Sequence, residues 1–157
     1  MNIQEFKANI PSFLEQAIDI VDHISNVKID KDKIDIESLS ILDDVVLYMN
    51  NLFKKDLIND TVARNAAVSL GVLLGEIIIS KNPLYWDMNE EEIPVLRKNE
   101  NSYISPITKV YKIITDMEDE EGTPSGFYSG YLALEKWNAM SDDEKEAITV
   151  HILEDEE

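Results

Sequence analysis

Apolar residues recur at steps of three and four along the first half of the chain, which is typical of helices with one buried face. This pattern predicts a first helix over 11–24, with Pro11 in its first turn, where a missing N–H costs little. Residues 3–9 form either a separate turn or an extra helical piece. It predicts a second helix over 35–55 and a third over 61–80, with Asp60 as the N-cap of the third. The second half of the third helix is apolar on nearly all sides, so we expect it in the middle of the domain.

Two glycine pairs repeat a four-residue spacing, Gly71 with Gly75 and Gly126 with Gly130. Inside a helix each glycine costs about 1 kcal/mol relative to alanine, so a compensating contact is expected. For Gly71 and Gly75, we expect another backbone to pack closely against this face of the third helix. Packing within the domain is the favoured interpretation, and a homodimer built through the glycine-bearing face is the alternative.

The pattern changes after the third helix. Short aromatic or β-branched runs at 84–86, 93–97 and 102–104 are separated by polar turns. They predict a small antiparallel sheet of two or three strands at about 84–104. Because proline cannot donate to a strand ladder, Pro94 indicates that its strand either lies at the edge of the sheet or starts late.

The helical pattern returns after the strands, where Ser105-Pro106, Thr123-Pro124 and a capping box at Ser141 each predict a helix start. Together these segments predict an α+β fold that is mostly helical, with about five or six helices and the small sheet. We expect a single acidic globular domain over 1–157, with a frayed tail at 154–157.

Charge is the outstanding property of the composition, since 14 basic residues against 32 acidic ones give a net charge of −18. Residues 85–157 carry −13 of that charge. Such a surface repels nucleic acid and anionic membranes, so we expect neither as a direct partner, and it attracts basic proteins. The predicted partner-binding residues are Asp87, Glu90, Glu91, Glu92, Asp116, Glu118, Asp119, Glu120 and Glu121.

The sequence offers little for catalysis or metal binding. It has no cysteine and only two histidines, His23 and His151, which lack the spacing of a zinc site. The acidic run 116–122 resembles a calcium loop, but its glycine falls at the seventh position of the loop instead of the sixth. No motif for a nucleophile, a phosphate or a dinucleotide is present. We therefore expect no catalytic residues, no metal and no cofactor.

The first residues lack the basic and apolar regions of a signal peptide. The longest apolar stretch, at 68–79, is short and interrupted by glycines, a serine and a glutamate, so it does not predict a membrane span. With the absence of cysteine, these features predict a cytoplasmic protein.

Glu76 is the one acidic residue in the most apolar helix. If it is buried, it needs a hydrogen-bond partner or a raised pKa, and the indole N–H of Trp86 is a candidate partner. The favoured interpretation is a polar tie between the third helix and the strands. The alternative is a pocket formed by Glu76, Trp86, Tyr103 and Tyr111 that binds a small ligand or performs chemistry on one.

Five short motifs follow one another between about 60 and 115: Leu70-Gly71-Val72-Leu73-Leu74-Gly75-Glu76, Trp86, Ile93-Pro94-Val95-Leu96, Tyr103-Ile104-Ser105-Pro106 and Lys109-Val110-Tyr111-Lys112. In this order they resemble a loose group of uncharacterised small acidic bacterial proteins, some of which are similar to immunity proteins that stand beside toxin genes. The resemblance implies an α+β topology and a toxin as the basic partner, and it supplies no catalytic residues.

The leading prediction is therefore a non-enzymatic cytoplasmic binding protein, of the immunity or inhibitor type, that engages a basic partner through an acidic surface. A ligand-binding protein or enzyme with a pocket around Glu76 and Trp86 is the first alternative. A homodimeric structural protein is the second.

Overall fold

The computed structural model describes residues 2–34, 37–115 and 143. The chain divides into two compact units, Met1–Pro124 and Ser125–Glu157, and every described residue except Asp143 belongs to the first. The prediction of a single domain over 1–157 therefore stays a prediction.

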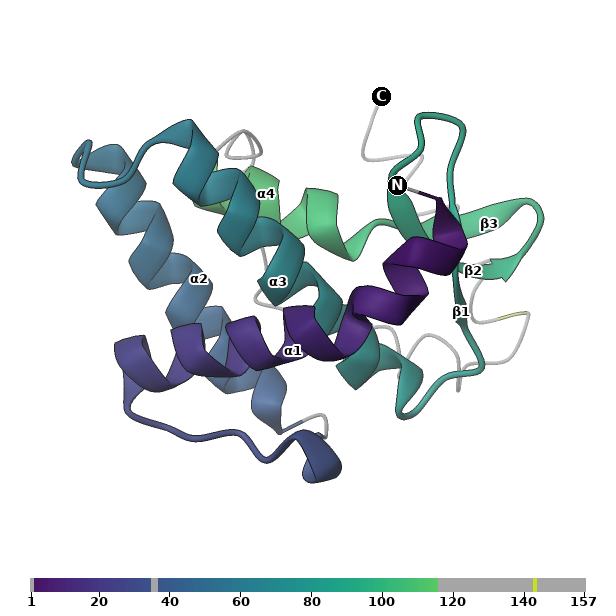
Figure 1. Ribbon diagram of the computed structural model, residues 1–157, viewed down its shortest axis with the longest axis horizontal. Coiled ribbons are helices and arrows are strands. Elements are labelled where there is room, and N and C mark those ends of the chain that lie inside the picture. The colour runs from purple at the N-terminus through teal and green to yellow at the C-terminus, as the bar shows by residue number, and fades with distance from the viewer. Residues whose placement is uncertain (1, 35–36, 116–142, 144–157) are drawn as a thin grey trace. The chain divides into compact units, whose positions relative to one another are not determined.

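The first unit is an α+β fold with mostly helical structure and a small antiparallel sheet, as the sequence predicts (Figure 1). Four α-helices, and not five or six, occur among the described residues, since the helices predicted after Thr123-Pro124 and Ser141 lie outside them. The elements in chain order are α1 (Ile3–Ser25), the short 3₁₀ helix η1 (Lys31–Lys33), α2 (Ser38–Lys54), α3 (Asp60–Ile79), β1 (Tyr85–Met88), β2 (Pro94–Asn99), β3 (Ser102–Ile104) and α4 (Pro106–Thr115).

The apolar helix α3 lies at the centre of this unit, in contact with α1, α2 and α4. Its residues from Ala66 to Gly75 are almost all buried, which confirms the central position that its all-round apolar pattern predicts. By length and composition, α3 is also the one described helix that could cross a membrane, but most of it is buried inside the protein. Its packing against three other helices accounts for its apolar composition.

The first helix starts eight residues earlier than predicted, so Pro11 lies inside α1 and not in its first turn. Asn2 is the N-cap, since its side-chain oxygen accepts from the Glu5 backbone N–H at 2.8 Å. An interior proline costs about 3 kcal/mol. Burying the Phe6 side chain stabilises the fold by about the same free energy, and Ile3 and Ile10 pack beside it against the same core. Of the two possibilities for residues 3–9, the extra helical piece is therefore the one that forms, and the core contacts of Phe6 stabilise it.

Helix caps also differ from the predicted ones. Asn59, and not Asp60, is the N-cap of α3, because the Asn59 side-chain oxygen accepts from the Val62 N–H at 2.9 Å. An asparagine one residue earlier competes well for this role, and it leaves the Asp60 carboxylate free for other contacts. The predicted start of the second helix, Asp35, lies outside the described residues, and α2 is described from Ser38.

A buried amide joins α2 to the end of α4. Asn50 is 5% exposed, and its Nδ2 donates to the carbonyl oxygens of Ile113 and Ile114, both at 3.0 Å. These carbonyls belong to the last residues of α4 that the structure describes. The Asn50 side chain therefore ties α2 to α4.

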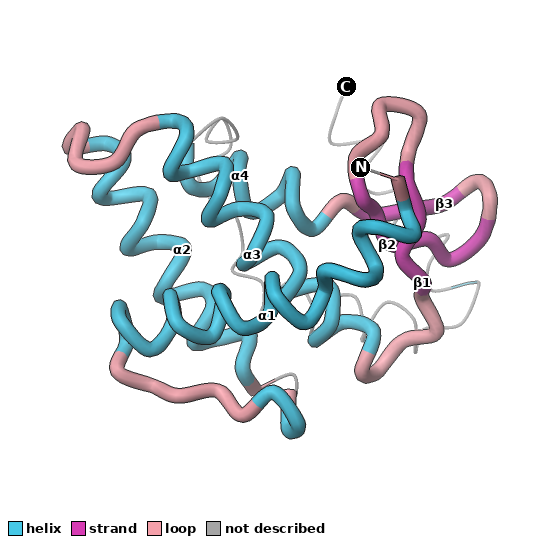
Figure 2. The backbone as a smooth tube through the Cα atoms, viewed as in Figure 1, coloured by secondary structure: helices cyan, strands magenta, loops and turns pink. Residues whose placement is uncertain are grey.

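The sheet has the strand order β1-β2-β3, with both pairs antiparallel, and Figure 2 shows it beside the N-terminal half of α1. Pro94 is the first residue of the central strand, so its predicted late start is confirmed, whereas an edge position is wrong. Pro94 pairs with Met88 at the last step of the β1–β2 ladder, where a missing N–H is tolerated.

Gly71 and Gly75 allow other elements to approach α3 closely. A Cβ added at Gly71 would lie 2.5 Å from the Cα and 2.9 Å from the N of Ile107, at the start of α4. A Cβ at Gly75 would overlap the ring of Trp86. The glycine-bearing face is thus filled from within the unit, as favoured from the sequence, and a homodimer through that face has no room for its partner. Gly126 and Gly130 lie outside the described residues.

Candidate functional site

The predicted polar tie between α3 and the sheet is present. Trp86 is 5% exposed, and its indole Nε1 donates to the Glu76 carboxylate at 3.1 Å. The same ring packs edge-on against Phe6, with 5.1 Å between ring centroids, and rests on Gly75. Glu76 is half-buried and its carboxylate accepts from a neutral donor, so its contact fits a structural role.

The four residues of the predicted pocket do not meet at one place. Tyr103 is exposed and lies beside Arg97, whose Cζ is 5.2 Å from the centroid of the tyrosine ring. Tyr111 donates to Asp60 at the first turn of α3, about 24 Å along that helix from Glu76. Only Glu76 and Trp86 are brought together.

A polar cluster that the sequence does not predict joins the first turn of α3 to α4. The Tyr111 hydroxyl donates to Asp60 Oδ1 at 2.5 Å, and Arg64 Nε donates to Asp60 Oδ2 at 2.6 Å. The hydrogen bond from Tyr111 holds the pKa of Asp60 below its ordinary value of 3.8, and the same bond raises the pKa of Tyr111 above 10.0. The four-residue spacing of Asp60 and Arg64 could have indicated the ion pair, but nothing local indicates Tyr111.

Tyr111 is expected to ionise at a higher pH than an unbonded tyrosine, because deprotonation breaks its bond to Asp60. The contact should stabilise the fold above the unfolded pKa of Asp60, near 3.8, and lose this effect as the pH falls further. It should stabilise the fold below the unfolded pKa of Tyr111, near 10.0, and lose this effect as the pH rises through the higher folded value.

The measurement is a titration of tyrosinate absorbance in which the curve of Tyr111→Phe is subtracted from that of the parent. Tyr48→Phe removes an exposed tyrosine that makes no polar contact in the described part of the chain, and it provides the reference curve. A Tyr111 difference curve that coincides with this reference would contradict the hydrogen bond.

The turn between β1 and β2 is held by Asn89. The side-chain Oδ1 of Asn89 accepts from the backbone N–H groups of Glu91 and Ile93, both at 2.9 Å. The backbone N–H of Asn89 donates to the Ile93 carbonyl at 2.9 Å. Glu92 adopts a left-handed conformation, with φ of 61°. The three consecutive carboxylates Glu90, Glu91 and Glu92 are exposed on this fixed turn, and none forms an ion pair with a described residue.

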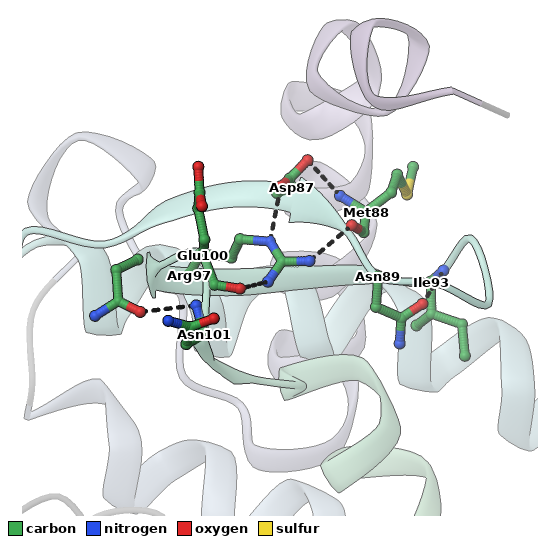
Figure 3. Close-up of polar contacts among 8 residues, drawn as sticks. Asp87, Met88, Asn89, Ile93, Arg97, Glu100 and Asn101 are labelled. Carbon is green, nitrogen blue, oxygen red and sulfur yellow. Dashed lines mark hydrogen bonds and ion pairs between the residues drawn. The ribbon is translucent and has the colours of Figure 1, made fainter.

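Unlike Glu90, Glu91 and Glu92 on the turn, Asp87 has its carboxylate bonded within the fold. Arg97 Nε donates to Asp87 Oδ2 at 2.7 Å, and Asp87 Oδ1 accepts from the Met88 N–H at 2.8 Å (Figure 3). The bond from Met88, and then that from Arg97, lowers the pKa of Asp87 below its ordinary 3.8. Asp87 therefore positions Arg97 and is not available to a partner without breaking these bonds.

The remaining predicted partner-binding residues, Asp116, Glu118, Asp119, Glu120 and Glu121, lie outside the described residues. Within the ranges that are described, no group of three or more acidic or histidine side chains is arranged to hold a metal ion. Sequence analysis missed Asn89 and Arg97, which fix the acidic turn and its strands. The Asn89 contacts are local, two and four residues along the chain, so an asparagine at a turn could have indicated them. The Arg97 contacts with Asp87 and Met88 depend on the strand register, which a single sequence does not contain.

Comparisons of the chain with protein-family models, with curated proteins and with solved structures found no match. The resemblance to small acidic bacterial proteins therefore stays a prediction.

Proposed function

We propose that the chain is a non-enzymatic protein that binds a basic protein partner through the carboxylates of its β1–β2 turn. The observation that carries this proposal is the exposure of Glu90, Glu91 and Glu92 on a turn that the Asn89 side chain holds in one conformation. The resemblance to immunity proteins adds the expectation that the partner is a toxin and that both act in the cytoplasm.

Two physical effects support binding at this turn. The net charge of −18 attracts a basic protein from a distance and raises its association rate, especially at low salt. The fixed backbone lowers the conformational entropy that the turn loses on binding, so three carboxylates contribute more than they would on a mobile loop. A carboxylate that is already paired within the fold, such as Asp87 with Arg97, is not available to a partner in this way.

The proposal is tested with a nona-lysine peptide as the basic probe, titrated calorimetrically at several salt concentrations. Affinity should fall as salt rises. The variant Glu90→Gln/Glu91→Gln/Glu92→Gln should bind about 5- to 30-fold more weakly, because each lost surface ion pair is worth roughly 0.3–0.7 kcal/mol.

The matched control removes the same charge from exposed acids of α1, in the variant Glu15→Gln/Asp19→Asn/Asp22→Asn. It should weaken binding about threefold or less, through the long-range field only. Equal losses in the two variants would show that binding follows net charge, and the turn would then not be the site. Absence of binding by the parent protein at low salt would overturn the proposed function.

A further inference from the structure

The turn between β1 and β2, residues 89–93, is called the acidic turn below, and the residue before it, Met88, is not held by the strand ladder. The Asn89 N–H donates to the Ile93 carbonyl within the turn, and Met88 and Pro94 form the next pair toward the sheet. Bonded and non-bonded pairs alternate along an antiparallel ladder, so the pair of Met88 and Pro94 is one without ladder hydrogen bonds. The N–H and carbonyl groups of Met88 therefore need other partners.

Two side chains supply these partners. Asp87 Oδ1 accepts from the Met88 N–H at 2.8 Å, and Arg97 Nη2 donates to the Met88 carbonyl at 3.2 Å. Arg97 Nε also donates to Asp87 Oδ2 at 2.7 Å, which closes a ring of three residues (Figure 3). The acidic turn thus leaves the sheet from a residue that is held at both of its backbone polar groups.

The Arg97 side chain is itself fixed in place. Its Nη1 donates to the Glu100 carbonyl at 3.3 Å, its Cζ lies 5.2 Å from the centroid of the Tyr103 ring, and only 14% of the side chain is exposed. The planar guanidinium directs its three nitrogen atoms to three partners at once, Asp87, Met88 and Glu100. A lysine carries the same charge on a single nitrogen atom, so it cannot bond all three.

We propose that Arg97 is a positioning residue for the binding of a basic partner at the acidic turn. Arg97 acts through Met88, by fixing the direction in which the turn presents its three carboxylates, Glu90 to Glu92. Its charge is paired with Asp87, so the shape of the guanidinium carries this role. A turn that is already ordered loses less conformational entropy when a partner binds. This inference rests on the proposed function and adds a residue on which the affinity depends.

The test replaces Arg97 by lysine, which keeps the charge and therefore the long-range field. In calorimetric titrations at low salt, nona-lysine should bind Arg97→Lys about three- to tenfold more weakly than the parent, because the turn must then be ordered on binding. The matched control is Arg64→Lys. Arg64 also pairs with an aspartate and lies over a tyrosine ring, but it belongs to α3 and bonds no group of the turn. This control should bind within about twofold of the parent.

A double substitution separates positioning from a general effect on the protein. In the variant of the turn that lacks its three carboxylates, Glu90→Gln/Glu91→Gln/Glu92→Gln, the further change Arg97→Lys should alter the affinity for nona-lysine by less than about twofold. No carboxylates then remain to be positioned.

Amide hydrogen exchange tests the same role without a peptide. The N–H groups of Glu91 and Ile93, which donate to Asn89 Oδ1, should exchange about threefold faster or more in Arg97→Lys than in the parent. In Arg64→Lys they should exchange at the parent rate.

A second variant covers the case in which Arg97→Lys does not fold, which the unfolding midpoint reveals. In Asp87→Asn the side-chain oxygen can still accept from the Met88 N–H, but the ion pair with Arg97 is lost. This variant should bind nona-lysine at least about twofold more weakly than Asp19→Asn, which removes the same charge from an exposed position of α1.

The two ways of failing are distinguishable. Parent affinity or parent exchange rates in Arg97→Lys, or an equal loss of affinity with and without the three carboxylates, would overturn the positioning role while the proposed function stands. Failure of nona-lysine to bind the parent at low salt would overturn the proposed function, and the exchange rates would still report whether Arg97 orders the turn.

Discussion

Replacing Asn50 by aspartate is expected to lower the free energy of unfolding by about 4 kcal/mol. The Asn50 amide donates to two carbonyl oxygens of α4, and a carboxylate can donate to neither. Each of the two lost hydrogen bonds contributes about 0.5–1.5 kcal/mol. The new charge is also buried and faces two carbonyl oxygens, which adds to the loss.

Urea unfolding followed by circular dichroism measures this effect, and Asn51→Asp is the matched control. Asn51 is the next residue of α2 but is exposed, so the same change there should cost less than about 0.5 kcal/mol. Asn50→Leu separates the causes, because it removes the two hydrogen bonds without adding a charge, and an intermediate loss is expected. Similar stabilities of the Asn50 and Asn51 variants would contradict the two hydrogen bonds from Asn50 to α4.

Alanine at Gly71 or Gly75 is expected to destabilise the fold by about 2 kcal/mol, although alanine is the better helix former. At Gly71 the added Cβ meets backbone atoms of Ile107, so α3 and α4 must move apart. At Gly75 it meets the buried Trp86 ring, which Phe6 holds from another side. Overpacking of this kind costs about 1–3 kcal/mol or more, and the gain in helix propensity of about 1 kcal/mol offsets only part of it.

The control is an exposed position of the same helix, where alanine should make the fold more stable than glycine does. At position 65, where Asn65 is exposed, the Asn65→Ala variant should be about 1 kcal/mol more stable than Asn65→Gly. Tryptophan fluorescence, measured in a Trp137→Phe background, should change in Gly75→Ala and much less in Gly71→Ala. A Gly71→Ala variant as stable as the parent would contradict the close packing of α3 on α4.

Much of the fold could be predicted because it depends on local patterns. The start of α4 at Pro106, the central place of α3 and the tie between Glu76 and Trp86 all agree with the sequence-based expectations. In each case neighbouring residues along the chain carry the signal, such as a cap followed by proline, an all-round apolar helix, or one acid among apolar residues.

The features that could not be predicted depend on residues far apart in sequence. Asn50 looks like a polar interruption of an apolar stripe until α4, more than 60 residues later, brings carbonyls to it. The early start of α1 requires Phe6 to reach the sheet. The pairing of Arg97 with Tyr85 and Tyr103 requires the strand register, because a one-residue shift would turn the arginine to the other face of the sheet.

The contact of Phe6 with Trp86 has a consequence for synthesis of the protein. The first helix leaves the ribosome long before the strand that covers it, because 80 residues separate the two aromatic rings. At roughly 5–20 residues per second, the apolar side of the nascent helix waits about 4–16 s for its partner. During that interval it is a natural binding target for ribosome-associated chaperones, and the docking of the N-terminal helix becomes a late event in the folding of each new chain.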